Sequence, residues 1–329
     1  MATKQEQEGA RDEIEEVAPR ILRMQLPISM PGLGHVNAYA ILDDKGAAIV
    51  DTGVPGPINW RALQRRLKDA GMGLKDVHTV VVTHSHHDHF GAAGRLVKES
   101  GADLVTHTSF DASWRRRRGG PSSWGGRRRG GPPLRRRIQY RMMRVVSHAW
   151  SPPVPTKPLD DEGELIIGDR RFVGLHTPGH TKDHLCLLDP ENKVLLSGDH
   201  VLPTITPHIS GMWSGGAEDP LTDFFASLDK VAKLDVGLVL PAHGHPFNDL
   251  AQRCREIHDH HLERLDKLVA AAEAKGEATV EELSKEIFHP RHWGFMADSE
   301  SFAHLEHLRL SGRAERIEGD DGLARYRVS

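Results

Sequence analysis

One short segment constrains the fold of this chain more than any other. Residues 83–89, T-H-S-H-H-D-H, contain five potential metal ligands within six positions. They directly follow residues 79–82 (TVVV), whose β-branched character is typical of a buried strand. Neutral imidazoles and a carboxylate are ligands that suit zinc, iron or manganese. The segment therefore predicts a strand that ends in a metal-binding loop, and the alternative is an exposed histidine-rich loop.

Three later residues supply donors of the same chemistry. His180, Asp199 and His243 each follow an apolar run and are flanked by glycine or proline. This context is typical of a strand end that turns into a loop. A single histidine or aspartate in such a place is more often a capping or hydrogen-bonded residue. Three of them, in this order after residues 83–89, predict one shared site.

Together these motifs resemble the metallo-β-lactamase superfamily over about residues 25–250. Asp51-Thr52-Gly53, which follows the apolar residues 47–50, is similar to the Asp-Thr-Gly that ends a strand in that family. The resemblance implies an α/β fold of the αββα type, in which two stacked sheets lie between outer helices and the metals bind at one edge. The residue pattern alone predicts only an α/β or α+β fold.

The resemblance also implies a role for each candidate residue. It assigns the first ion to His84, His86 and His180, the second ion to Asp88, His89 and His243, and the bridge between the ions to Asp199. Asp51 would orient a ligand through a hydrogen bond, and His87 matches a variable position of the motif. The expected cofactors are two zinc ions, with iron or manganese as alternatives.

The implied chemistry is hydrolysis. Two divalent ions that share a water molecule lower its pKa enough to supply hydroxide near neutral pH. Asp88, beside the second ion, would act as the catalytic residue that orients this nucleophile and takes its proton. The expected activity is that of a dinuclear hydrolase which uses a metal-bridged hydroxide on an ester, thioester or lactone of a small compound, anionic in some cases.

Three other functions stay open. One is an endoribonuclease or phosphodiesterase that acts on single-stranded RNA, and another is a mononuclear iron persulfide dioxygenase. The third, a DNA-binding regulator with a structural metal, fits less well, because a ligand set without cysteine suits an open catalytic site. True β-lactamases of the superfamily usually lack the bridging carboxylate, so antibiotic hydrolysis is not expected.

Composition sets the broad class of the protein. A chain of 329 residues with 38% apolar content has room for one large and one small domain. Cys186 and Cys254 fit no disulfide framework, residues 1–20 lack a secretory signal, and no stretch reaches the roughly 18 apolar residues that span a bilayer. We therefore expect a cytoplasmic protein that acts on a small molecule without a membrane partner. Its oligomeric state is left open, a homo-oligomer included.

An arginine- and glycine-rich insert occupies residues 115–144. It contains twelve arginines and no acidic residue, although the net charge of the whole chain is −3. Three interpretations compete: a flexible low-complexity loop, a surface that captures an anionic substrate such as a CoA or phosphate ester, and an RNA contact in which Trp124 stacks on bases.

The domain boundaries follow from the remaining pattern. Residues 1–20 predict a polar, solvated lead-in, and residues 21–250 the catalytic domain. Residues 251–276 predict a linking helix that Asn248 caps and Gly276 ends. Residues 277–329 predict two helices and a hairpin, which resemble the small winged-helix-like domain of a subgroup of the family.

Two further residues are candidates for substrate binding. His208 and Trp213 lie in the loop that closely follows Asp199. Binding residues are often found on such loops, and loop packing is the alternative for both.

Overall fold

The computed structural model describes residues 4–30, 32–111, 154–210 and 218–328. The first sheet contains β1 (Ile14–Ala18), β2 (Ile21–Met30), β3 (Leu33–Asp43), β4 (Gly46–Val50), β5 (Val77–Val81), β6 (Asp103–His107) and β7 (Lys157–Leu159), in this spatial order. The second sheet has the order β12 (Leu238–Pro241), β11 (Val194–Gly198), β10 (Leu185–Asp189), β9 (Arg170–His176) and β8 (Glu164–Ile167).

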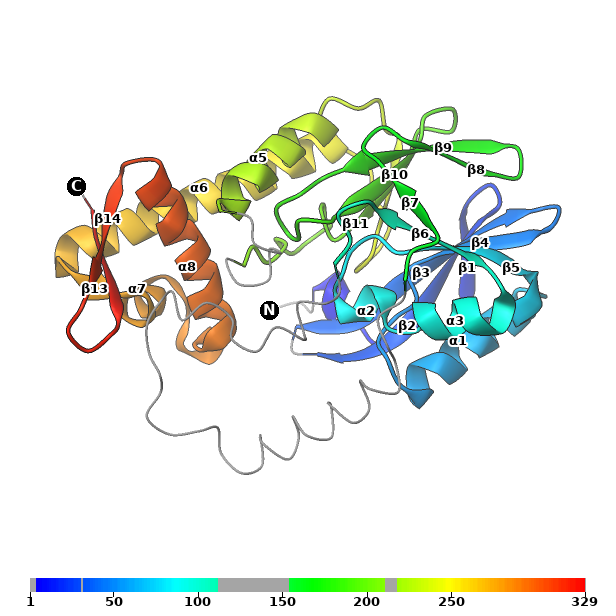
Figure 1. Cartoon of the computed structure of the whole chain (residues 1–329), viewed down its shortest axis with the longest axis horizontal. Coiled ribbons are helices and arrows are strands. Elements are labelled where there is room, and N and C mark those ends of the chain that lie inside the picture. The colour runs from blue at the N-terminus through cyan, green and yellow to red at the C-terminus, as the bar shows by residue number, and fades with distance from the viewer. Residues whose placement is uncertain (1–3, 31, 112–153, 211–217, 329) are drawn as a thin grey trace.

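Helices lie on the outer faces of the two sheets, at the loop edge of the sandwich and beside a small C-terminal sheet (Figure 1). They are α1 (Pro57–Asp69), α2 (His87–Phe90), α3 (Ala93–Ser100), α5 (Pro220–Val231), α6 (Leu250–Lys275), α7 (Val280–Ile287) and α8 (Phe295–Leu310). Short 3-10 turns are η1 (Gln5–Gln7), η2 (Leu74–Asp76) and η5 (Pro290–His292). A small third sheet combines β13 (Ala278–Thr279), β15 (Ala324–Val328) and β14 (Ala314–Glu318).

The strand β3 shows why the two sheets stack. Successive side chains of a strand point to opposite faces of the sheet. Tyr39 and Ile41 belong to the apolar cluster between the two sheets, whereas Ala38 and Ala40 belong to the cluster that α1 and α3 cover. A strand buried on both faces has a continuous apolar sequence, as this segment does. The predicted αββα sandwich is confirmed.

Parallel strands bring the candidate site together. β4 runs parallel to β5 in the first sheet, and β11 runs parallel to β12 in the second. The segments that carry Asp51, His84, Asp199 and His243 follow the carboxyl ends of these four strands. Loops that follow parallel strands meet at one edge of a sheet, and this edge is where the ligands converge.

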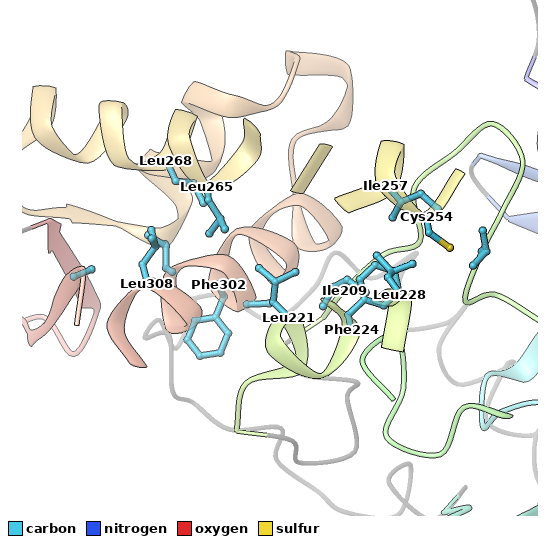
Figure 2. Close-up of a cluster of buried hydrophobic side chains, with 14 of the residues drawn as sticks. Ile209, Leu221, Phe224, Leu228, Cys254, Ile257, Leu265, Leu268, Phe302 and Leu308 are labelled. Carbon is cyan, nitrogen blue, oxygen red and sulfur yellow. The ribbon is translucent and has the colours of Figure 1, made fainter. Parts of the chain in front are cut away.

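The C-terminal elements share the core of the sandwich. The helix α6 passes from the second sheet to α7, α8 and the third sheet (Figure 1). Figure 2 shows side chains of α5, α6 and α8 in one apolar cluster, among them Phe224, Leu265 and Phe302. The same cluster includes Cys186 of β10 and Tyr326 of β15. Residues 277–328 are therefore packed against the catalytic domain through a shared apolar core.

The predicted C-terminal elements themselves are present. Thr279 and Glu282 form the expected capping box at the start of α7, with Glu282 N donating to Thr279 Oγ1 over 3.3 Å. Gly276 ends α6 with a φ of 71°. The prediction that Asn248 caps α6 is wrong, because Asp249 occupies the N-cap. The winged-helix character of this region stays a prediction.

The polar lead-in predicted for residues 1–20 is wrong for its second half. Residues 14–18 form β1, which pairs antiparallel with β2 at the edge of the first sheet. Glu15 and Glu16 are exposed there, because an edge strand is held by backbone hydrogen bonds and does not require alternating apolar residues. Glu6 of η1 is fully buried.

Two predictions fall outside the described residues. They concern the arginine-rich insert at 115–144 and Trp213.

A further prediction concerns the membrane. No helix in the described part of the chain combines the length and the apolar character needed to cross a bilayer.

Candidate metal centre

All seven predicted ligands come together at one edge of the sandwich. His84 and His86 follow β5, Asp88 and His89 belong to α2, His180 lies between β9 and β10, Asp199 follows β11, and His243 follows β12. Their donor atoms form two compact groups. The first group is His84, His86, His180 and Asp199, and the second is Asp88, His89 and His243, with the donor atoms of each group within 4.8 Å of one another.

Asp199 lies between the two groups. Its Oδ2 is 3.5 Å from Nε2 of His180 and 3.5 Å from Nε2 of His89. Its Oδ1 is 3.4 Å from Nε2 of His243. One carboxylate thus faces histidines of both groups, which is the arrangement that a bridging ligand requires.

The donor atoms fit divalent cations. Nε2 of His84, His89 and His243 and Oδ1 of Asp199 are buried, and they make no hydrogen bond within the described part of the chain. A buried polar atom left unpaired costs about 1–3 kcal/mol, so a cluster of them calls for a ligand. Two atoms that each lie about 2.0–2.1 Å from a tetrahedral zinc ion are roughly 3.3 Å apart. The observed separations of 3.4–3.5 Å around Asp199 are close to this spacing.

Hydrogen bonds fix which ring nitrogen of each histidine is available. Carbonyl and carboxylate oxygens only accept, so a ring nitrogen bonded to one carries a proton, and in the neutral ring the other nitrogen keeps its lone pair. His89 Nδ1 donates to Asp51 Oδ2 (2.7 Å), His180 Nδ1 to the His208 carbonyl (2.9 Å), and His243 Nδ1 to the His35 carbonyl (2.7 Å). In all three, Nε2 is therefore the atom that a metal could take, and in His180 this atom lies 3.0 Å from Nδ1 of His86.

Asp51 accepts hydrogen bonds from two residues of the site, His89 and Thr83. Besides His89, it accepts hydrogen bonds from Thr83 N (2.9 Å) and Thr83 Oγ1 (2.9 Å). The Thr83 hydroxyl, having donated to Asp51, accepts from Nδ1 of His84 at 3.0 Å. Asp51 has a φ of 60°, a backbone conformation that few residues other than glycine adopt and that is often found at functional sites. Asp51 therefore contacts the ring of His89 and the residue that precedes His84, and its role in orienting a ligand stays a prediction.

We expect Asp51→Asn to weaken metal binding by about 10–100-fold, the usual cost of losing a group that holds a ligand. Asparagine offers one acceptor oxygen, whereas Asp51 accepts from both Thr83 and His89. Competition with a chromophoric chelator measures the affinity. Asp69→Asn, at the exposed end of α1, is the matched control, and equal affinity of both variants for zinc would contradict the assignment.

Burial and the neighbouring charges set the protonation of the site. Burial lowers the pKa of His84 well below its usual value and that of His86 to about 3, and adjacent imidazoles act in the same direction. Burial also opposes a charge on His89 and His243, but the carboxylates of Asp199 and Asp88 outweigh it and raise both pKa values. The two carboxylates therefore make this buried edge favourable for positive charge.

His184 is a positioning residue that the sequence analysis missed. Its Nε2 accepts a hydrogen bond from the backbone N–H of Asp199 at 3.1 Å, and its Nδ1 donates to Thr177 Oγ1 at 2.8 Å. A Cβ at Gly198 would stand 2.7 Å from that same Nε2, so glycine allows the close approach. The available signal was a second histidine four residues after His180, at the start of a buried strand.

Asn37 was also missed. This buried residue of β3 donates from Nδ2 to the carbonyls of Pro241 (2.8 Å) and Gly244 (2.9 Å), on either side of His243. A residue of the first sheet thus fixes the loop of the second sheet that carries His243. A polar residue inside the apolar run of β3 was the signal that could have revealed it.

The two substrate-side candidates have different outcomes. The His208 carbonyl contacts His180, while its ring Nδ1 lies 3.2 Å from Glu300 Oε2 on α8. Trp213 lies outside the described residues.

The chain belongs to the metallo-β-lactamase superfamily, whose family model matches residues 31–243. A metallo-beta-lactamase family protein from Thermus thermophilus has a similar structure, with a TM-score of 0.79 and 30% sequence identity, over 95% of this chain and 100% of that protein. The resemblance stated from the motifs is confirmed.

Two curated relatives extend the comparison. Lactamase-like protein adaB of Aspergillus niger is 26% identical over 265 residues, which are 79% of this chain and 66% of the relative. The atrochrysone carboxyl ACP thioesterase dmxR1 of a Cryptosporiopsis species is 23% identical over 82% of this chain and 72% of its own length. This chain thus spans 66% of the length of adaB. The chain therefore combines the metallo-β-lactamase family match with two compact groups of candidate metal ligands.

Proposed function

We propose that the protein hydrolyses the ester, thioester or lactone bond of a small compound with two divalent ions, zinc in the first place. The observation that carries this proposal is the carboxylate of Asp199, which faces histidines of both groups. Such ions, when bound, supply a nucleophile near neutral pH and polarise the substrate oxygen. The name of dmxR1 as a thioesterase favours thioesters among these substrates.

The side chains of the site have separable tasks in this proposal. His84, His86 and His180 would hold one ion, Asp88, His89 and His243 the other, and Asp199 both. Asp88 Oδ2 lies 3.4 Å from His243 Nε2. Burial alone would raise the pKa of Asp88, but the neighbouring His89 and His243 lower it, so the carboxylate stays ionised. An ionised Asp88 can accept a hydrogen bond from the attacking nucleophile and orient it.

The remaining proposals rest on the sequence. Residues 115–144 would attract an anionic substrate or RNA, and His208 and Trp213 would contact the substrate. A cytoplasmic location is compatible with two buried cysteines, Cys186 and Cys254, that form no disulfide. A phosphodiesterase acting on single-stranded RNA is the second candidate function, because the insert combines arginine with tryptophan.

Metal content and a substrate panel test the proposal together. We expect about two zinc ions per chain in protein purified without chelators or added metals. We also expect hydrolysis of acyl thioesters, aryl esters or lactones that a chelator abolishes and zinc restores. About one iron per chain, with oxygen consumption on a persulfide, would overturn the hydrolase proposal. Cleavage of labelled single-stranded RNA alone would replace the ester substrate with a phosphodiester.

A further inference from the structure

A chain of contacts links the metal centre to the C-terminal helix α8. The ring of His180 donates from Nδ1 to the backbone carbonyl of His208 at 2.9 Å. The ring of His208 in turn lies 3.2 Å from Oε2 of Glu300, measured from Nδ1. Glu300 is 92 residues away from His208 in the sequence. The orientation of one proposed ligand therefore depends on a residue of α8.

Glu300 is itself fixed from several sides. Its side chain is buried, and its Oε1 is paired with Arg264 of α6. Its backbone carbonyl accepts a hydrogen bond from Nδ1 of His304 at 2.7 Å, and His304 Nε2 lies 3.0 Å from Nδ1 of His261. Burial would raise the pKa of Glu300, but Arg264 and His208 lower it, so the carboxylate is ionised.

These contacts argue against a third metal position here. His261, Glu300 and His304 form a group of the kind that can bind an ion. Arg264 already neutralises Glu300, however, and both carboxylate oxygens have partners, one in Arg264 and one in His208. A buried ion pair costs desolvation of both charges, so it gives little stability by itself and is better explained by the geometry it imposes.

The loop between Asp199 and Ser210 is fastened at three places. Glu6 of η1 accepts hydrogen bonds from Thr204 N (2.8 Å) and Ile205 N (3.1 Å). Arg253 of α6 donates from Nε to the Leu202 carbonyl over 2.7 Å. The third fastening is α8 itself, through the ring of His208 on Glu300 and through Ser210 Oγ, which lies 2.6 Å from Ser299 Oγ.

The contacts of the loop with α8 differ from the other two sets in the residues that they hold. The contacts with α8 flank the carbonyl that His180 contacts. The Glu6 and Arg253 contacts hold residues 202–205 instead. We propose that Glu300 is a positioning residue for His180, acting through His208, so that α8 sets the affinity of the first metal position. This inference rests on the proposed metal centre.

The expected effect concerns metal affinity rather than folding alone. Without the Glu300 carboxylate, the His208 ring loses its contact with α8, and the carbonyl that holds His180 can shift. Groups that orient a metal ligand typically contribute about 10–100-fold to affinity. We expect Glu300→Ala to weaken the binding of one of the two zinc ions by this factor and to leave the affinity for the other nearly unchanged. Glu300→Gln keeps one acceptor oxygen, so its effect should be smaller.

The experiment measures zinc affinity of the full chain by competition with a chromophoric chelator. Glu306→Gln is the matched control, because Glu306 lies on α8 and pairs with Arg309 and Tyr326. It should lower thermal stability without changing zinc affinity. A cobalt-loaded Glu300→Ala protein should show an altered visible spectrum, which a purely structural role would not produce.

A second variant keeps the test informative if Glu300→Ala folds poorly. His208→Ala removes the ring that contacts Glu300 but keeps the carbonyl that His180 needs. It should weaken the binding of the same zinc ion. The double variant His208→Ala with Glu300→Gln should bind this ion no more weakly than the weaker of the two single variants, as expected for residues that act in series. Wild-type affinity for both zinc ions in Glu300→Ala and His208→Ala would overturn the proposal. A wild-type chain that binds no divalent ion would instead refute the metal centre, and the coupling with it.

Discussion

Asp199→Asn is expected to lower kcat/KM by on the order of 10³-fold or more, above the 10–100-fold typical of groups that only orient a ligand. The amide keeps the size of the side chain but removes the negative charge that faces both groups of histidines. Because the carboxylate contacts both groups, we expect the loss of metal at both positions. Elemental analysis and steady-state kinetics measure the two effects.

Replacing any buried carboxylate can lower the stability of the fold without affecting metal binding. The control variant must therefore also replace a buried carboxylate. Asp189→Asn, at the end of β10, removes a buried carboxylate that pairs with Arg170 and Asn192. It should lower the unfolding temperature and leave the metal content unchanged. Asp199→Asn that retains two metal ions and its activity would refute the bridging role.

His84→Ala should abolish turnover, whereas His87→Ala should retain most of it. Both residues belong to the same seven-residue segment, but of the two only His84 has a donor atom in the ligand groups found among the described residues. The loss of one of three histidines around an ion leaves an incomplete coordination shell. The dissociation constant for zinc should then exceed the micromolar zinc concentrations used in an assay. Activity assays with and without added zinc test both variants. Full turnover in His84→Ala would show that the metal mechanism is wrong.

The ligands could be predicted because their chemistry is local in the sequence. Four of the seven predicted ligands lie in residues 83–89, and the other three each follow a strand. A strand that ends in a loop needs only a few residues to be recognised. The fold followed from the same motifs through the resemblance, since the residue pattern alone did not distinguish α/β from α+β.

The residues that hold the ligands could not be predicted in this way. His35 contacts His243 across 208 residues, and Glu300 contacts His208 across 92. Such contacts exist only after the two sheets and α8 have packed, and a single sequence carries no record of them. The edge strand β1 was missed for a different reason. It is stabilised by its backbone pairing with β2, so Glu15 and Glu16 leave no apolar alternation to detect.

The helix α6 has a consequence for how this protein can change over evolution. It runs for 26 residues without a break, and it carries Arg264 toward Glu300 while its first turns contact the loop after Asp199. Each residue added to an α-helix turns everything beyond it by about 100° and advances it by about 1.5 Å. A single insertion between Arg253 and Arg264 would therefore put the two contacts out of phase. Insertions and deletions tolerated during evolution should accordingly spare this part of α6 and fall in loops instead.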